Sequence, residues 1–473
     1  MTPEEFRAAG HLLIDWIADS RASVEDQPVL AQVEPGDVRA RFETDAPTDT
    51  SSFEALLAEL DTTVIPGVTQ VQHPMHFGWF PSNASLSSVL GDIASSGIGS
   101  LGISWESSPA LTEVEEVMCD WMRQLTGLSD AWLGSIHDTA STACLVALLV
   151  ARERATDLVQ NTGGLQSVDE PLMIYTSPQA HSSVAKAALL AGFGWDNIRM
   201  IDVDSDTFAM NAAALKAAMD VDAAEGKIPA AVVAAVGTTG TTAMDPVRSI
   251  VEAAASHGAF VHVDAAMAGT AMLLPECRHL WDGIEGADSI SWNPHKWMGT
   301  ILDCSLLYMR DVDLLQRIMA TNPSYLQSPS GDDATQFRDW GIPLGRRFRS
   351  LKLLFQLRLD GIDAIRARLR RDLENAQWFK AQVEATDGWT VVAPVDLQTV
   401  CVRYQPEGFI DGHELDAFTQ SWARSINASG DAFLSPSKLP DGWMVRVSIG
   451  VLGTERHHVE RLWTLMQETV QQG

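Results

Sequence analysis

From about residue 110 onward, short apolar segments alternate with amphipathic helical patterns, and this alternation constrains the fold more than any other feature. Strands are predicted at Met173–Tyr175, Ala231–Val236, Phe260–Val263, Ser289–Trp292 and Ser305–Met309. Nearly continuous apolar strands are typical of a parallel sheet covered by helices on both faces. We therefore expect an α/β fold with a mostly parallel sheet and a ligand site at the carboxyl ends of its strands.

Three segments are expected along the 473 residues. Residues 1–80 form an N-terminal helical segment, 81–350 a large α/β domain and 351–473 a small C-terminal α+β domain. The first helix begins with a capping box, in which Thr2 caps and Glu5 reaches back. Its apolar stripe needs a partner, which is either the rest of the chain or a second subunit. The stripe consists of Phe6, Ala9, Leu13, Trp16 and Ile17.

The composition excludes several classes of protein. A formal charge of −29 argues against nucleic acid and anionic membranes as partners. No uninterrupted apolar run reaches the ~18 residues that a membrane-spanning helix needs. The acidic start is unlike a signal peptide, and five scattered cysteines suit reduced thiols. We expect a cytoplasmic enzyme of ordinary composition, with 46% apolar residues.

Asp264 and Lys296 follow successive predicted strands. A buried carboxylate at a strand end is costly unless a cation faces it, and a protonated pyridine nitrogen is such a cation. A lysine on a loop beside His295 can form an imine with an aldehyde cofactor. A structural Asp264 remains an alternative. A metal site with His262 lacks a third ligand at suitable spacing.

Other polar residues follow the predicted strands or open helices. Ser141 lies in a small, hydroxyl-rich helix start, where free N–H groups bind phosphate; a plain N-cap at Asp138 or Thr139 is compatible with this. Thr238 lies in a second hydroxyl-rich turn, after a buried strand. His181 follows the strand at Met173–Tyr175 and has the chemistry to stack on a ring or move protons near neutral pH.

Four runs in this order are similar to the group II pyridoxal-dependent decarboxylases, above all the aromatic-L-amino-acid decarboxylase family. The similarity extends from the first helix to residues 445–449. The runs are Gln179-Ala-His-Ser-Ser183, His262-Val-Asp-Ala-Ala-Met-Ala-Gly269, Asn293-Pro-His-Lys-Trp297 and Ile342-Pro-Leu-Gly-Arg-Arg-Phe-Arg-Ser350. The resemblance implies a type I aminotransferase-like fold with a seven-stranded sheet. It also implies pyridoxal 5′-phosphate as cofactor, no metal, and a homodimer with shared active sites.

The resemblance also implies roles for individual residues. Lys296 would form the imine, Asp264 would pair with the pyridine nitrogen and His181 would stack on the ring. The remaining cofactor contacts would come from Ala140, Ser141, Thr238, Ala266, Asn293 and His295. The substrate pocket would be lined by Trp79, Phe80, Pro81 and Gly345, with Leu101 and Ile103 reaching in from the other subunit.

One departure from the family bears on the product. Phe337 stands just before Arg338-Asp-Trp340, where we expect the loop tyrosine of family members, and the only tyrosine between residues 323 and 338 is Tyr325. A phenol can protonate the substrate carbon, whereas a phenyl ring cannot. Phe337 is therefore included among the catalytic positions, and oxygen could intercept the carbanionic species if no proton arrives.

Three functions follow from these residues. The first is decarboxylation of an aromatic L-amino acid (DOPA, tyrosine, phenylalanine or tryptophan) to the amine and CO2. The second is an aldehyde synthase that forms aldehyde, CO2, ammonia and hydrogen peroxide. The third, a silent pyridoxal-binding scaffold, conflicts with the presence of Lys296, Asp264 and His181 together. Arg346 and Arg347 are interpreted as salt-bridged structural residues rather than substrate ligands.

Overall fold

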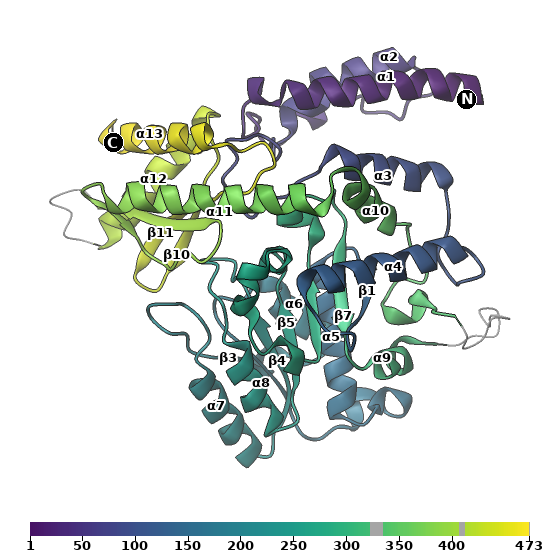
Figure 1. Ribbon diagram of the computed structural model, residues 1–473, viewed down its shortest axis with the longest axis vertical. Coiled ribbons are helices and arrows are strands. Elements are labelled where there is room, and N and C mark those ends of the chain that lie inside the picture. The colour runs from purple at the N-terminus through teal and green to yellow at the C-terminus, as the bar shows by residue number, and fades with distance from the viewer. Residues whose placement is uncertain (322–333, 406–411, 473) are drawn as a thin grey trace. The chain divides into compact units, whose positions relative to one another are not determined.

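The computed structural model describes residues 1–321, 334–405 and 412–472, and the chain divides into two compact units (Figure 1). Unit 1 contains Met1–Pro81, Asn375–Val392 and Cys401–Gly473. Unit 2 contains Ser82–Glu374 and Ala393–Val400. The large unit therefore continues past the expected boundary at residue 350, and residues 1–80 belong to the same unit as the C-terminal segment. No described helix is long and apolar enough to cross a membrane.

Unit 2 is built on the expected mostly parallel sheet. Its seven strands are ordered β1-β7-β6-β5-β4-β2-β3. The pairs β6–β5, β5–β4, β4–β2 and β2–β3 are parallel, while β7 is antiparallel to both of its neighbours. The strands are β1 (Leu133–His137), β2 (Leu172–Thr176), β3 (Ile198–Met200), β4 (Ile228–Ala235), β5 (Phe260–Asp264), β6 (Ser289–Trp292) and β7 (Ser305–Met309).

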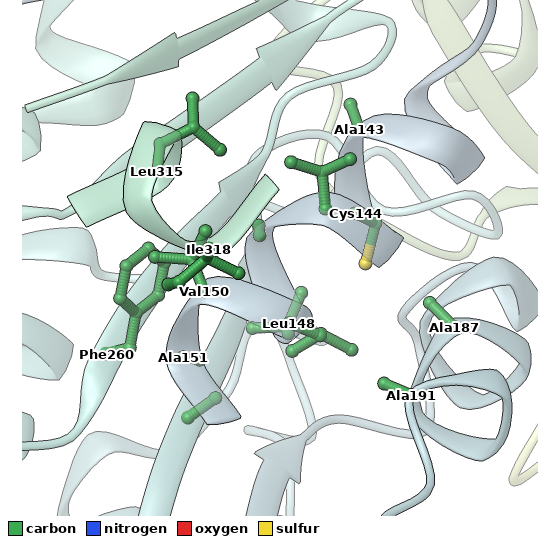
Figure 2. Packing of buried hydrophobic residues seen from close by; sticks show 14 of the residues in the cluster. Ala143, Cys144, Leu148, Val150, Ala151, Ala187, Ala191, Phe260, Leu315 and Ile318 are labelled. Atoms are coloured by element: carbon green, nitrogen blue, oxygen red, sulfur yellow. The ribbon is translucent and has the colours of Figure 1, made fainter. Parts of the chain in front are cut away.

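Helices cover both faces of this sheet. Alternate strand residues such as Ala231, Val233 and Leu307 join the buried cluster around α5 (Ala140–Ala155), which Figure 2 shows packed against Ala187 and Phe260. The other unit 2 helices are α3 (Leu86–Ile98), α4 (Pro109–Thr126), α6 (Ser182–Leu190), α7 (Ala212–Ala224), α8 (Val247–Ala255), α9 (Val312–Met319) and α10 (Ser350–Leu359). Because side chains alternate along a strand, Asp264 lies on the same face as Phe260, toward α5.

Unit 1 combines helices with a small antiparallel sheet of order β10-β11-β9-β8. The predicted capping box is confirmed, since Thr2 Oγ1 accepts from Glu5 N (3.2 Å) and Thr2 N donates to Glu5 Oε2 (2.6 Å). The elements are α1 (Pro3–Ala22), α2 (Phe53–Glu59), β8 (Trp389–Val391), β9 (Thr399–Tyr404), α12 (Gly412–Ser429), β10 (Ser435–Leu439), β11 (Gly442–Ser448) and α13 (Arg456–Gln472). The long helix α11 (Ile362–Glu384) and the strand β9 each contribute residues to both units.

Candidate active site

Asp264 ends β5 with 7% of its side chain exposed. Its Oδ1 accepts a hydrogen bond from Ala266 N (3.0 Å), and it forms no ion pair with any side chain in the described part of the chain. A buried carboxylate without a cation is costly, so this position calls for a cationic ligand. Its neighbour His262 is held by the hydroxyls of Ser289 (2.8 Å) and Ser291 (3.2 Å), which disfavours the metal alternative.

Lys296 lies in a short helical turn, Pro294–Met298, that follows β6. The turn is interrupted at the lysine, whose φ of −99° and ψ of −114° are not helical. Asn293 N donates to Ala266 O (3.0 Å), so the lysine turn is bonded to the turn that follows Asp264. The Asn293 Oδ1 atom is buried and has no hydrogen-bond partner among the residues described.

His181 is the N-cap of α6, and its Nδ1 accepts from Ser183 N (3.2 Å). That bond leaves the proton of the neutral imidazole on Nε2. Partial burial lowers the pKa of His181, as does the Lys296 ammonium, while the Asp264 carboxylate raises it. Lys296 and Asp264 therefore both act electrostatically on His181 within unit 2.

The start of α5 supplies an anion site next to these groups. Thr139 is the N-cap, and its Oγ1 accepts from Thr142 N (3.4 Å). The N–H groups of Ala140 and Ser141 lie in the first turn, where a helix has no internal acceptors for them. Burial and the nearby Asp264 carboxylate raise the pKa of the Cys144 thiol, which indicates that this helix start lies beside Asp264.

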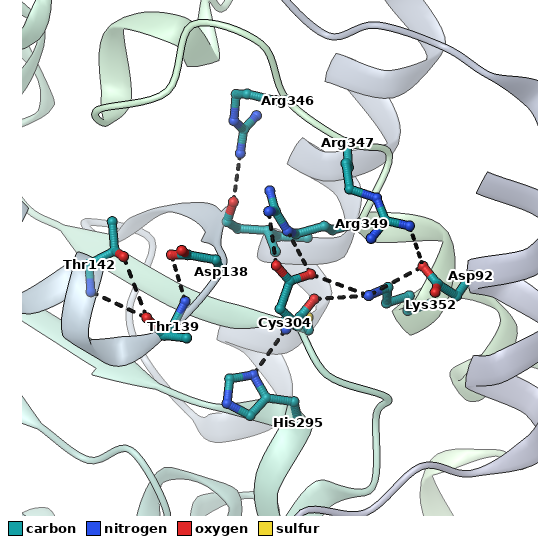
Figure 3. A network of polar contacts seen from close by, with 12 residues as sticks. Asp92, Asp138, Thr139, Thr142, His295, Cys304, Arg346, Arg347, Arg349 and Lys352 are labelled. Carbon is teal, nitrogen blue, oxygen red and sulfur yellow. Dashed lines mark hydrogen bonds and ion pairs between the residues drawn. The ribbon is translucent and has the colours of Figure 1, made fainter. Parts of the chain in front are cut away.

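Two predicted cofactor residues hold turns together. The Thr238 hydroxyl accepts from Ala243 N (2.9 Å) and closes the turn after β4. The His295 Nδ1 accepts from Cys304 N (2.9 Å), as Figure 3 shows, and burial lowers the pKa of this imidazole to about 4. A direct contact of either residue with the cofactor stays a prediction.

These groups fit pyridoxal phosphate. Asp264 forms no ion pair with a side chain that the structure describes and suits a protonated ring nitrogen, while the Lys296 amine suits the aldehyde. The first turn of α5 suits the phosphate. The buried Asn293 Oδ1 has no hydrogen-bond donor among the described residues, so a donor group of the cofactor could bind it. Ala266 is partly buried, and its contact with the cofactor ring stays a prediction.

Trp79, a predicted pocket residue, forms an aromatic cluster with His76 and Phe433 within unit 1. Trp79 has a positive φ of 49° and is 51% exposed, and its ring lies 4.9 Å from the Phe433 ring and 5.5 Å from the His76 ring. Its backbone N–H donates to Ser435 Oγ (2.7 Å). A non-glycine residue in this conformation is strained, and such strain is common at functional sites. Pro81 is buried.

Arg446 also lies in unit 1, and it was not singled out from the sequence. Its guanidinium lies 4.7 Å from the Phe80 ring centre, and its side chain is 5% exposed. Its Nε and Nη2 atoms have no hydrogen-bond partner among the described residues. A buried cation without an anion calls for an anionic ligand. Its position within residues 445–449, where the similarity to the decarboxylase family ends, was the one indication of a role that the sequence offered.

Leu101 and Gly345 are brought together within unit 2, and Ile103 is partly buried two residues after Leu101. Leu101 is 53% exposed, and a Cβ built on Gly345 would lie 3.4 Å from its Cδ1. Gly102 N donates to Arg346 O (3.0 Å), which joins the two segments. This exposed apolar surface suits the predicted contact with another subunit, which stays a prediction.

Phe337 is a packing residue in this structure. It is 5% exposed, belongs to the core cluster around α5, and packs edge-on against Trp340 at 5.2 Å. The Arg346 guanidinium lies 4.8 Å from its ring centre and is bound to buried Glu115 (3.0 Å). Together with the Arg347–Asp92 pair (3.0 Å), this confirms the structural interpretation of both arginines. Tyr325 and most of the predicted 323–338 loop lie outside the described residues.

Comparison with known proteins identifies the family of this chain. Residues 35–405 match the family described as the pyridoxal-dependent decarboxylase conserved domain. Phenylacetaldehyde synthase of Arabidopsis thaliana is 37% identical over 99% of this chain and 96% of its own length. Tryptophan decarboxylase 2 of Oryza sativa subsp. japonica is 36% identical over 99% of this chain and 95% of its own.

Solved structures give the same result for the fold. The crystal structure of Oryza sativa TDC with PLP and tryptamine superposes with a TM-score of 0.96 at 35% identity, covering 100% of this chain and 99% of that one. Catharanthus roseus tryptophan decarboxylase in complex with L-tryptophan superposes with a TM-score of 0.93 at 34% identity, with coverage of 100% and 99%. The expected fold class is therefore confirmed.

Proposed function

Because the chain belongs to the family of pyridoxal-dependent decarboxylases, we propose that it converts an aromatic L-amino acid to the corresponding amine and CO2. The observation that carries the proposal is the buried Asp264 carboxylate, which forms no ion pair with any described side chain and, like Lys296, acts electrostatically on His181. A carboxylate placed there serves a ring that must stay protonated to accept electrons.

Each residue of the site then has a defined task. Bound pyridoxal phosphate supplies an electron sink for the bond between Cα and the carboxylate. Asp264 keeps the proton on the ring nitrogen, Lys296 holds the cofactor aldehyde, and the first turn of α5 binds the phosphate. His181 carries a proton on Nε2, because its Nδ1 is occupied by Ser183 N, and this proton is available to the substrate carbon.

The aromatic substrate class is supported by the unit 1 cluster. Trp79, Phe80 and Phe433 offer faces for an aromatic side chain. Arg446 offers a buried guanidinium for the substrate carboxylate. The solved relatives named above contain tryptamine and L-tryptophan, which supports the same class.

The aldehyde-forming alternative rests on Phe337. Its burial against Trp340 and Arg346 favours a packing role. Similarity does not decide the product, because an aldehyde synthase and decarboxylases match at nearly the same identity. We favour the amine as product because Phe337 has a packing role and His181 offers the proton that the substrate carbon needs.

Homodimer formation and a cytoplasmic location are parts of the same proposal. The α1 helix has no buried residue, and Phe6 at the start of its apolar stripe is 65% exposed, so this part of the stripe is available to a second copy of the chain. The exposed Leu101 is a further candidate for this interface. All five cysteines are buried free thiols, which suits a reducing compartment.

The test uses purified enzyme with pyridoxal phosphate and phenylalanine, tyrosine, tryptophan or DOPA in turn. We expect equal amounts of amine and CO2 and no matching peroxide, and no turnover by Lys296→Ala. Peroxide equal to the CO2 released would establish the aldehyde synthase instead. Absence of CO2 from all four substrates would refute the proposed substrate class.

A further inference from the structure

The turn that carries Lys296 is tied down by side chains from other helices of unit 2. From α10, Gln356 Nε2 donates to Met298 O (3.2 Å), and its Oε1 accepts from Thr300 Oγ1 (2.6 Å). Lys352 Nζ donates to the carbonyl of Asp303 (3.1 Å), whose neighbour Cys304 binds His295. Both ends of the turn are therefore fixed.

Trp297, the residue directly after Lys296, is held by hydrogen bonds to both its side chain and its backbone. Its Nε1 donates to Asp372 Oδ2 (2.9 Å), and its carbonyl accepts from Arg368 Nη2. The same Arg368 nitrogen reaches Met298 O (3.2 Å), and Arg368 Nη1 donates to Asp372 Oδ2 (3.0 Å). Two residues one turn apart on α11 thus form hydrogen bonds with the indole and the backbone carbonyl of Trp297.

Stability alone is a poor reason for this arrangement. The side chains of Asp372 and Arg368 are 0% and 11% exposed, and Trp297 is fully buried. Burying an ion pair costs desolvation that its attraction often fails to recover, so apolar residues of similar size would serve the core as well. A charged pair does supply directional bonds that fix one rotamer and one peptide orientation.

We propose that Asp372 and Arg368 are positioning residues that act through Trp297 to orient Lys296 for its bond to the cofactor. The inference rests on the proposed role of Lys296. The carbonyl that Arg368 binds belongs to the peptide between Trp297 and Met298, so Arg368 and Asp372 fix the position of Trp297 itself. A rigid planar peptide joins Lys296 to Trp297, so a displacement of Trp297 is passed to the backbone of the lysine.

The test measures the pH midpoint of the imine absorption band in the holoenzyme, together with thermal stability. Asp372→Asn and Trp297→Phe should each shift the midpoint by at least about half a pH unit in the same direction. The double variant should shift it no further than the larger single change, because both remove the same restraint. Arg368→Lys keeps the charge but loses the forked contact, and should shift it likewise.

Arg370→Ala is the matched control. Arg370 lies between the two positioning residues on α11 and forms an exposed pair with Glu276 (2.7 Å), so this variant should leave the midpoint unchanged. Loss of thermal stability in the Asp372 and Trp297 variants with an unchanged midpoint would overturn the proposal. A shift in Asp372→Asn without one in Trp297→Phe would also overturn it, since that result indicates a through-space charge effect. Absence of any imine band in the wild type would instead refute the role of Lys296.

Discussion

His76 should make the protein sensitive to mild acid, and replacing it should remove a defined part of that sensitivity. The side chain is 2% exposed, and both ring nitrogens lack hydrogen-bond partners among the described residues. Burial lowers the pKa of His76 from 6.5 to about 4. Between these values the unfolded chain binds a proton that the folded chain excludes, so stability falls as the pH drops.

The magnitude follows from this shift. Each pKa unit corresponds to about 1.4 kcal/mol, so His76 alone should cost about 2 kcal/mol of stability between pH 7 and pH 5. His76→Phe preserves a ring against Trp79 and Phe433 and removes both unpaired nitrogens. At pH 7 this variant should be as stable as the wild type or more so, by about 1 kcal/mol.

Urea unfolding followed by tryptophan fluorescence at pH 7 and pH 5 measures the effect. The wild type should lose about 2 kcal/mol more than His76→Phe over this interval, because the other buried histidines contribute equally to both. His11→Gln, on an exposed position of α1, should behave as the wild type. Equal losses in His76→Phe and the wild type would refute the reasoning.

Three further predictions concern the site and its support. Glu115→Gln should lower the free energy of unfolding by about 3–5 kcal/mol, because it leaves Arg346 buried without its partner, and thermal denaturation would measure the change. Asp264→Asn should reduce kcat roughly 100-fold or more while the imine band remains; an unchanged kcat would exclude its electronic role. Phe337→Tyr should leave the ratio of amine to peroxide unchanged, because the ring is buried in the core. A higher ratio of amine to peroxide in Phe337→Tyr would instead make position 337 the decisive one.

The strands of the large sheet were predictable because their residues are apolar on both faces. Ser289–Trp292 and Ser305–Met309 were predicted with the bounds that the structure has. The strand at Leu133–His137 was missed, since Gly134, Ser135 and His137 break the apolar pattern. Its polar residues are tolerated because Ser135 Oγ and His137 Nε2 bond to each other (3.1 Å), which only the fold reveals.

The candidate catalytic residues could be proposed from the sequence because each is a reactive side chain next to a strand or helix end. Arg446 was not singled out, because a sequence does not show that an arginine is buried without an anion. Asp372 was missed for a related reason, since its partner Trp297 lies on a different element far away in the sequence. The packing role of Phe337 likewise depends on contacts with Trp340 and Arg346 that form only in the folded chain.

The central claim is that Lys296 bonds the cofactor, and borohydride reduction of the holoenzyme tests it most directly. Reduction converts the imine to a stable amine, and peptide mass analysis then locates the modified lysine. We predict a single pyridoxyl group on Lys296 in the peptide that contains Asn293 and Trp297. A pyridoxyl group on another lysine, with Lys296 unmodified, would contradict the account.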